Sequence, residues 1–398
     1  MKKNKLNTFT LSGLIIGPIL GSGVILLPPL LYNSIGDFSI FIWLGILTLG
    51  FIFAIIFGKL ANLFPGEAGV SNATKEALGK KYQLLTSFYL ICAVFFGPVA
   101  VLLIAGEFIK DFFPDISLSF LALCIYIITY ILLLIRIDFL GKLMLIVSSL
   151  ITIIFLLSSI VTLANANQYI FHIPHTDISQ IGKSFLLVFW SIVGWEVIGN
   201  YSNDVKDKKT LTKAVIFSVI TISLVYILIT LALIFGNFEQ QNDESIKLVW
   251  LIEPIFGTYS NIILTVISLI LCIGTLILFV GGVARLIASL KLTKYTSRHL
   301  PNGIPLGALN FLSFIYMITL GLVYFDILNL EHLVSFADGF FIANAIIGLV
   351  TAIALFENSF LRYGAVLLAI LFFTILLFSN IFILIVILLL FIYTLLQR

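Results

Sequence analysis

The chain has 398 residues, of which 61% are hydrophobic and only 10% are charged, and its formal net charge is +3. Ordinary soluble domains are about 45–50% apolar and about 25% charged. This composition excludes a soluble enzyme, a nucleic-acid-binding protein and a secreted disulfide scaffold, because none of them could cover so much apolar surface in water. We therefore expect an all-α integral membrane protein whose surroundings are the lipid bilayer.

Hydrophobic stretches long enough to cross a bilayer recur along the whole chain. A helix needs about 20 predominantly apolar residues to span the hydrocarbon core, and twelve segments meet that requirement. We expect them to form one transmembrane domain, residues 1–398, without a soluble domain between them. The predicted transmembrane helices cover residues 8–32, 37–62, 83–109, 117–135, 140–164, 181–202, 211–236, 258–290, 304–325, 331–356, 359–378 and 380–397.

The placement of basic residues predicts the orientation of these segments. Of the 22 Lys and Arg residues, all but Lys110, Lys183 and Lys247 lie where a twelve-helix chain with a cytoplasmic N-terminus has its cytoplasmic side. Cytoplasmic segments of membrane proteins carry an excess of Lys and Arg. We therefore expect a multi-pass protein of the cell inner (cytoplasmic) membrane with both termini in the cytoplasm.

The first predicted helix contains the triplet Gly21-Ser22-Gly23 near its middle. Glycine costs about 1 kcal/mol relative to alanine in a helix interior, and irregular backbone at membrane depth survives only where it is buried in protein or lines a cavity. An unwound triplet frees N–H groups that stabilise a carboxylate and carbonyls that suit an ammonium group. The competing interpretation is close helix packing, because Gly13, Gly17 and Gly21 recur every four residues.

The sixth predicted helix has a comparable feature, since Gly194 beside Trp195 indicates a helix break with an aromatic lid. Helices one and six are the first helices of two possible five-helix halves, residues 8–164 and 181–356, which have opposite orientations because five is odd. Interrupted helices at matching positions of inverted repeats are the best indication of a transporter's binding site.

Two carboxyl groups lie within the predicted spans, those of Glu196 and Asp338. Such groups are expensive in a membrane and are usually functional or paired. Glu196 is either a proton-coupling group or a structural carboxyl bonded to unwound backbone N–H groups. Asp338 either loads and releases a proton or is an aspartate that water reaches from an outer vestibule.

Several motifs follow one another along the chain in a recognisable order. They are Gly17–Pro28 in the first helix, Phe64–Val70 and Glu76–Gly79 after the second, Phe189–Glu196 in the sixth, and Ala284–Leu286 with Arg298–Asn302 after the eighth. Together they resemble the amino acid–polyamine–organocation (APC) superfamily of permeases. The tract Thr296–Asn302, with Ala337–Ile342 in the tenth helix, is most similar to its bacterial amino-acid efflux branch, whose members export methionine and branched-chain amino acids.

The resemblance implies a five-plus-five inverted-repeat (LeuT-type) core that works by alternating access, with two peripheral helices at 359–397. It also implies that backbone groups at the two breaks bind an amino acid beneath a gating aromatic residue. The N–H groups of Ser22, Gly23 and Val24 would hold the carboxylate, and carbonyls of Ile19 and Val193 the amino group. The implied site residues are Ile19, Gly21, Ser22, Gly23, Val24, Val193, Gly194 and Trp195.

The coupling ion is less clearly indicated. Some members of the superfamily carry a lysine deep in helix five in place of a sodium ion, whereas Lys142 lies at the cytoplasmic end of that helix here. The deeper positions are Ser148, Ser149 and Thr152, whose hydroxyls suit sodium or no ion at all. We expect coupling to protons, with Glu196 and Asp338 as candidates and with Na⁺ left open.

These observations favour a secondary transporter that exports neutral, hydrophobic L-amino acids and binds their side chains in an apolar pocket that includes Phe95 and Phe279. An ion-coupled uptake symporter or an exchanger of the same fold is the alternative, and an intramembrane enzyme or a non-transporting subunit is the rival of another class. We expect no catalytic residues, cofactor or metal, although His172 and His175 have metal-like spacing. The sequence does not indicate an oligomeric state.

Overall fold

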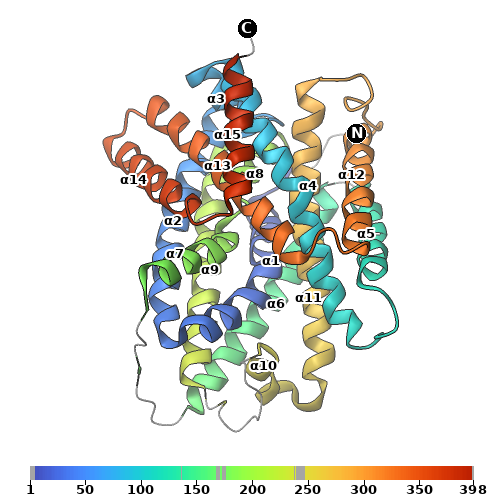
Figure 1. Ribbon diagram of the computed structural model, residues 1–398, viewed down its shortest axis with the longest axis vertical. Coiled ribbons are helices and arrows are strands. Elements are labelled where there is room, and N and C mark those ends of the chain that lie inside the picture. The colour runs from blue at the N-terminus through green and yellow to red at the C-terminus, as the bar shows by residue number, and fades with distance from the viewer. Residues whose placement is uncertain are drawn as a thin grey trace.

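The computed structural model describes residues 5–135, 137–166, 171–172, 176–236, 238 and 247–396 (Figure 1). Every regular element in these ranges is a helix, and their only strand-like pairing is a single bridge between Leu6 and Val205. The predicted all-α architecture is therefore confirmed.

The α-helices follow the predicted segments closely, with two short additions. They are α1 (Thr8–Ile35), α2 (Ser39–Leu63), α3 (Val70–Leu78), α4 (Lys80–Lys110), α5 (Leu118–Leu133), α6 (Ile137–Ala164), α7 (Ile178–Phe189), α8 (Trp195–Ile198), α9 (Lys208–Phe235), α10 (Val249–Phe256), α11 (Ser260–Leu290), α12 (Leu306–Tyr324), α13 (Leu330–Leu355), α14 (Ser359–Leu376) and α15 (Ile381–Leu396). Short 3₁₀ helices are η1 (Gly36–Phe38), η2 (Trp190–Ile192), η3 (Gly199–Asp204) and η4 (Gly257–Tyr259).

Within the described ranges, nine helical stretches are long and apolar enough to cross a membrane. The first of them, Thr8–Leu63, joins α1 and α2, and Val249–Leu290 joins α10 and α11. The apolar helices α5 and α15 are shorter. The molecule is thus a multi-pass membrane protein, as the composition predicts.

The short helices α3 and α10 lie in segments that the sequence analysis treats as loops. Glycines with positive φ flank α3, Gly69 at 52° and Gly79 at 93°, and Gly257 at 53° ends α10. Helices of nine and eight residues are too short to cross a bilayer, and therefore a search for spans passes over them.

The helix α1 lies at the centre of the bundle, against α6, α9 and α11, while α4 lies against α13, α11 and α5. Nearly every residue of α1 from Thr10 to Ile25 is buried, as expected of a helix that is hydrophobic on all sides. The helix α6 instead exposes an apolar stripe at helical spacing, which faces lipid in a membrane protein. That stripe consists of Ile146, Leu150, Ile153, Leu157 and Ile160.

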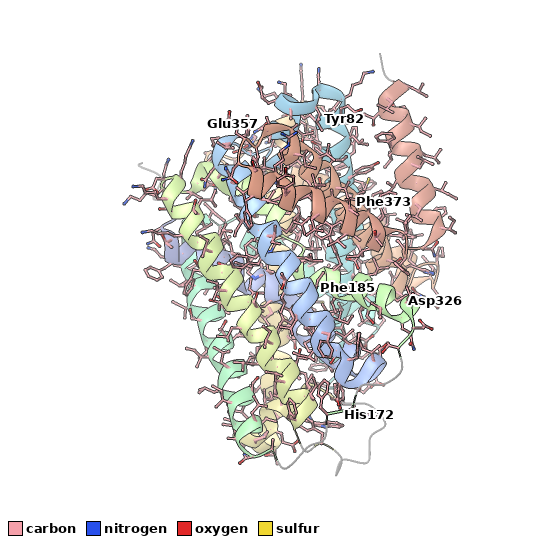
Figure 2. The ribbon with its side chains drawn as sticks, turned by 90° about the vertical axis from the view of Figure 1, so that its left-hand side faces the viewer. Tyr82, His172, Phe185, Asp326, Glu357 and Phe373 are labelled. Atoms are coloured by element: carbon pink, nitrogen blue, oxygen red, sulfur yellow. The ribbon has the colours of Figure 1, made fainter. Side chains whose placement is uncertain are left out.

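Both described ends of the chain are tied to the same end of the bundle. Leu6 pairs with Val205, the residue after η3. Within η3, the Ser202 hydroxyl accepts a hydrogen bond from the Gly66 N–H at 2.8 Å. The Lys81 ammonium, at the start of α4, donates to the Leu395 carbonyl at 3.1 Å. In Figure 2, Tyr82 and Glu357 lie at this end of the molecule and His172 lies toward the opposite end.

Candidate functional site

The central helix α1 is broken at Gly21, as predicted. Gly21 has φ 41° and ψ −141°, which is not helical, so α1 consists of two halves that meet at this residue. A Cβ added to Gly21 would collide with the Thr275 hydroxyl of α11, and that hydroxyl donates to the Pro18 carbonyl at 2.8 Å. Only glycine therefore fits the break, both by its backbone angles and by the space that is left.

The packing interpretation of the α1 glycines holds for Gly13 and Gly17 rather than for Gly21. The Cα of Gly13 lies against the backbone of Leu145, and a Cβ on Gly17 would be 3.1 Å from the Ser148 Cβ. Gly13 and Gly17 thus let α6 approach closely, whereas Gly21 breaks the helix. Of the polar residues predicted to lie deep in α6, Ser148 and Thr152 are buried, and Ser149 is exposed.

The sixth predicted helix is broken as well, over a longer stretch. The helix α7 ends at Phe189, η2 follows, and Val193 is extended with φ −73° and ψ 138°. Gly194 has φ 125°, a conformation that favours glycine, and α8 starts at the next residue. The Gly194 N–H donates to the Glu196 carboxylate at 3.1 Å, so this break satisfies one of its own free backbone groups.

The two breaks meet around one cavity. The Trp190 indole Nε1–H donates to the Ser22 hydroxyl at 3.3 Å, which connects η2 to the break in α1. The cavity has a volume of about 20 Å³, room for roughly one water molecule, so the site is contracted. Its lining comes from α1, α4, the second break, α11 and α13, and consists of Pro18, Ile19, Gly21, Ser22, Gly23, Gly97, Pro98, Val101, Trp190, Val193, Thr275, Leu276, Phe279 and Phe341.

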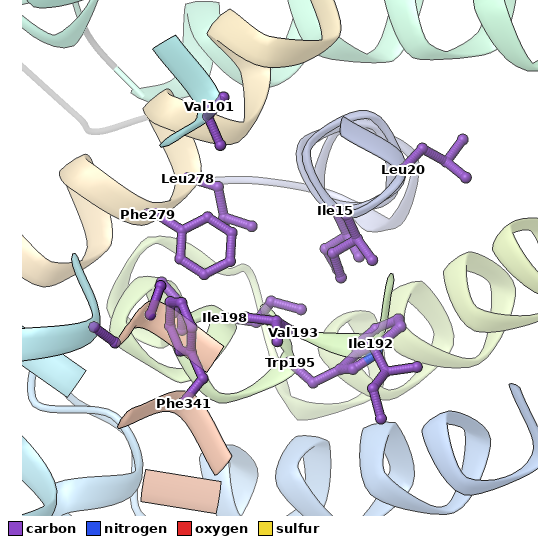
Figure 3. Close-up of a cluster of buried hydrophobic side chains, with 14 of the residues drawn as sticks. Ile15, Leu20, Val101, Ile192, Val193, Trp195, Ile198, Leu278, Phe279 and Phe341 are labelled. Carbon is purple, nitrogen blue, oxygen red and sulfur yellow. The ribbon is translucent and has the colours of Figure 1, made fainter. Parts of the chain in front are cut away.

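The lining is apolar apart from backbone groups, two hydroxyls and the indole N–H. Among the residues that the structure describes, no charged side chain lines the cavity. Phe279 and Phe341 form an aromatic wall, with ring centroids 5.4 Å apart and planes at 66°, near Val101 and Val193 (Figure 3). Such a site offers peptide dipoles to a polar group and apolar side chains to an apolar one.

Most of the predicted site residues are brought together. Of them, Ile19, Gly21, Ser22, Gly23, Val193 and Phe279 line the cavity. Gly194 lies directly behind it, because a Cβ there would be 3.0 Å from the Ile19 Cγ1 and 3.4 Å from the Phe279 Cζ. Val24 is fully buried in α1 but is not part of the lining.

The structure places two predicted aromatic residues elsewhere. Trp195 is buried outside the cavity, beside Ile192 in Figure 3, whereas Trp190 lines the cavity. The reason is that the 3₁₀ turn and the positive φ of Gly194 reorient the chain between these two tryptophans. Phe95 is also outside, packed against Phe311 with ring centroids 6.0 Å apart.

The two intramembrane carboxyls are both buried but differ in their contacts. Glu196 accepts the Gly194 N–H, in agreement with the structural interpretation of this residue. Asp338 on α13 is only 3% exposed, and its Oδ1 has no hydrogen-bond partner among the described residues. Asp338 is therefore closed off from bulk solvent in this conformation, and both interpretations of its role stay predictions.

The predicted pair of histidines lies only partly within the described residues. The backbone N–H of His172 donates to the Asp37 carboxylate at 2.7 Å, and His175 lies outside the described ranges. Within those ranges, no three His, Cys, Asp or Glu side chains gather in a way that could hold a metal ion.

The predicted site residues do not include eight of the lining residues, namely Pro18, Gly97, Pro98, Val101, Trp190, Thr275, Leu276 and Phe341. Gly97-Pro98 inside α4 carries a detectable signal, because proline is disfavoured within a helix. Thr275 is a single polar residue in an apolar span, and Val101 and Phe341 are ordinary helix residues. Their roles depend on which helix face meets the breaks, which the sequence does not specify.

Two interrupted helices that meet at an apolar cavity inside a helical membrane protein are typical of a membrane transporter. Comparison with known proteins gives the family. A family model described as "Amino acid permease" matches residues 6–397, and the chain therefore belongs to the amino acid permease family, within the APC superfamily that its motifs resemble.

Individual relatives agree with this assignment. The chain is 24% identical over 349 residues to the L-methionine/branched-chain amino acid exporter YjeH of Escherichia coli (strain K12), covering 83% of this chain and 81% of that protein. It is 21% identical over 284 residues to the uncharacterized amino acid permease YecA of Bacillus subtilis (strain 168), covering 70% of this chain and 67% of that protein. These relatives are transport proteins, not enzymes.

A solved structure shares the fold. The crystal structure of the Eremococcus coleocola manganese transporter, in complex with an aromatic bis-isothiourea substituted compound, superposes with a TM-score of 0.67 over 98% of this chain and 94% of that one. The two sequences are 13% identical, so the likeness concerns the fold alone.

Proposed function

We propose that this chain is a secondary active transporter that exports neutral, hydrophobic L-amino acids such as methionine, leucine, isoleucine and valine. One observation carries the proposal: two broken helices expose backbone groups to a cavity whose lining includes no charged side chain among the described residues. A zwitterion finds complementary dipoles there, while an additional charge on its side chain would lose its hydration without gaining a partner. The exporter among the relatives supports the direction of transport.

In the proposed binding mode, the carboxylate lies at the N–H groups that begin the second half of α1. The first N–H groups of a helix have no carbonyl partner within that helix, and the partial positive charge there favours an anion. The ammonium group lies between the carbonyls of Ile19 and Val193, at the ends of the preceding segments. The side chain points to Phe279 and Phe341, which line the same cavity.

The proposed architecture is a twelve-helix bundle with both termini in the cytoplasm. Its core consists of two inverted five-helix repeats, 8–164 and 181–356, and the helices at 359–397 are peripheral. The shared location of both described chain ends supports an even number of crossings. Since the contracted cavity holds roughly one water molecule, substrate entry requires α1 and the second break to move apart.

Coupling to protons forms part of the proposal, with Asp338 as the leading carrier. A carboxyl without a hydrogen-bond partner in the protein interior is costly when ionised, so its protonation would change as its surroundings alternate. Glu196 is the second candidate, but its carboxylate already accepts the Gly194 N–H. Sodium coupling remains the alternative outcome of the test below.

Flux in proteoliposomes tests the function. Purified protein is reconstituted, and labelled methionine, leucine, alanine, arginine and glutamate are followed under separate proton and sodium gradients. We expect methionine and leucine to move fastest, arginine and glutamate not to move, and a proton gradient to drive accumulation. If a sodium gradient alone stimulated flux, sodium rather than the proton would be the coupling ion. If expressing cells accumulated the amino acid, the direction would be uptake rather than export. A lack of flux for every amino acid would overturn the proposal.

A further inference from the structure

Tyr226 on α9 is a fully buried tyrosine whose hydroxyl lies against the break in α1. Its side chain is 0% exposed, and its ring stacks on Trp43 of α2, with centroids 4.4 Å apart and planes at 21°. The stacked pair fixes the direction of the phenol. Its hydroxyl has no hydrogen-bond partner among the residues that the structure describes, although buried tyrosine hydroxyls usually find one.

The position of this hydroxyl relates it to the proposed carboxylate site. It lies 2.8 Å from the point where a Cβ on Gly23 would stand, and the Trp190 Cδ1 is 3.5 Å from the same point. Gly23 belongs to the first turn after the break at Gly21, where helix N–H groups lack carbonyl partners. An unpartnered O–H donor therefore lies beside the first turn of the second half of α1.

Burial of an unpartnered hydroxyl is not sufficient by itself, as a second tyrosine demonstrates. Tyr316 on α12 is also 0% exposed and also has an unpartnered hydroxyl within the described structure. Neither tyrosine lines the contracted cavity. Tyr316 packs edge-on against Tyr126 of α5, whereas the Tyr226 hydroxyl lies against Gly23. What distinguishes Tyr226 is its place at a helix N-terminus that opens into the cavity.

We propose that the Tyr226 hydroxyl donates a hydrogen bond to the α-carboxylate of the substrate and thereby selects carboxylates over uncharged analogues. This inference rests on the proposed function. The hydroxyl lies behind Gly23 and Trp190, which both line the contracted cavity. Widening of the cavity between these two residues, as substrate entry requires, exposes the hydroxyl to the ligand.

This arrangement explains why residue 23 is a glycine. Gly23 has ordinary helical geometry and no positive φ, so its backbone does not require glycine. A side chain there would press on the Tyr226 hydroxyl and occupy the route between it and the ligand. Because residue 23 has no Cβ, no side-chain atom of its own lies between the Tyr226 hydroxyl and the backbone of this turn.

The test compares L-methionine with L-methioninamide, which keeps the amino group and side chain but replaces the carboxylate by a neutral amide. Binding of both to detergent-purified wild type, Tyr226→Phe and Tyr316→Phe is measured by calorimetry. A hydrogen bond to a charged group corresponds to about a ten- to hundredfold change in affinity. We expect Tyr226→Phe to weaken methionine binding by that factor, to change methioninamide binding little, and Tyr316→Phe to change neither.

Thermal unfolding of the ligand-free proteins separates this role from a structural one. Because the hydroxyl has no partner in the unliganded structure, Tyr226→Phe should leave the melting temperature unchanged or raise it. A lowered melting temperature with an unchanged preference for methionine over methioninamide would assign the hydroxyl to stability and overturn the inference.

Two further outcomes are distinguishable. If wild type prefers methionine and Tyr226→Phe retains the full preference, Tyr226 does not contact the carboxylate, and the proposed function stands. If wild type binds no amino acid, both proposals fail. Should Tyr226→Phe not fold, Gly23→Ala tests the same contact from the other side, since its Cβ displaces the hydroxyl. Retention of the methionine preference by Gly23→Ala would then overturn the inference.

Discussion

The two helix breaks look equivalent in the sequence but differ in what they leave unsatisfied. In α1 the chain departs from helix at the single residue Gly21, and a long half-helix continues to Ile35. The second break extends from Trp190 to Gly194 and leads into the short helix α8. There the Glu196 carboxylate already accepts the Gly194 N–H, whereas no carboxylate of the described chain lines the cavity beside Gly21.

This difference divides the work of binding between the breaks. The second break carries its own carboxyl group, which already accepts the free N–H of Gly194. The first break presents N–H groups at the start of a half-helix, and no carboxyl group of the described chain lines the cavity there. We therefore infer that the first break binds the substrate carboxylate, while the second supplies carbonyl groups and shapes the room for the side chain.

The largest expected effect comes from closing the first break with Gly21→Ala. The φ of 41° is strained for any side chain, at about 1–3 kcal/mol, and the new Cβ meets the Thr275 hydroxyl. We expect transport of methionine in proteoliposomes to fall about a hundredfold or more, because about 1.4 kcal/mol corresponds to tenfold. Membrane insertion, followed by surface labelling, should persist.

The matched control is Gly321→Ala in α12. Gly321 has helical geometry, and nothing lies within 4 Å of a Cβ placed there. This substitution should leave transport unchanged and stabilise the helix by about 0.5–1 kcal/mol. If Gly21→Ala and Gly321→Ala transported methionine equally well, the first break would not be part of the binding site.

The next largest effect concerns the room beside the second break. The Phe279 ring lies 3.4 Å from the point where a Cβ on Gly194 would stand, and it lines the cavity. Phe279→Ala should weaken methionine uptake into proteoliposomes about tenfold and improve transport of the bulkier phenylalanine, since apolar pockets discriminate by about 1–3 kcal/mol. Phe95→Ala, outside the cavity, should leave the ratio of the two substrates unchanged, and an equal change in both variants would contradict this division.

The sequence predicted the breaks well because glycine and proline are visible wherever they interrupt an apolar span. The predicted breaks lie at Gly21 and Gly194, and both residues have positive φ. The choice between Trp190 and Trp195 could not be predicted, since it depends on a 3₁₀ turn that rotates the chain between them. Helix periodicity alone also fails to separate Phe95 from Val101, because which face of α4 meets α1 is a tertiary property.

A smaller effect is expected at Glu196, whose carboxylate satisfies the second break. Glu196→Ala leaves the buried Gly194 N–H without its acceptor and should destabilise the protein by about 1 kcal/mol. Glu196→Gln retains an oxygen acceptor and should unfold close to the wild-type temperature. Thermal unfolding in detergent measures both variants, and equal destabilisation by alanine and glutamine would contradict the capping role.

Variants of Glu196 and Asp338 distinguish a carboxyl that caps the break from one that carries the coupled proton. If Glu196 only caps the break, Glu196→Gln keeps the wild-type dependence of transport on pH. Asp338→Asn should then flatten that dependence, because Asp338 Oδ1 is buried without a partner in the described structure. The opposite assignment of the two pH profiles would make Glu196 the proton carrier.

The smallest expected effect distinguishes the two tryptophans of the second break. Trp190→Phe removes the indole N–H that donates to the Ser22 hydroxyl, a neutral hydrogen bond that contributes about 0.5–1.5 kcal/mol. The KM for methionine transport should therefore rise about two- to tenfold. Trp195 lies outside the cavity, so Trp195→Phe should change the melting temperature rather than the KM. If Trp195→Phe raised the KM more than Trp190→Phe does, Trp195 would be the aromatic residue that covers the substrate. The second break would then have to rearrange before substrate binds.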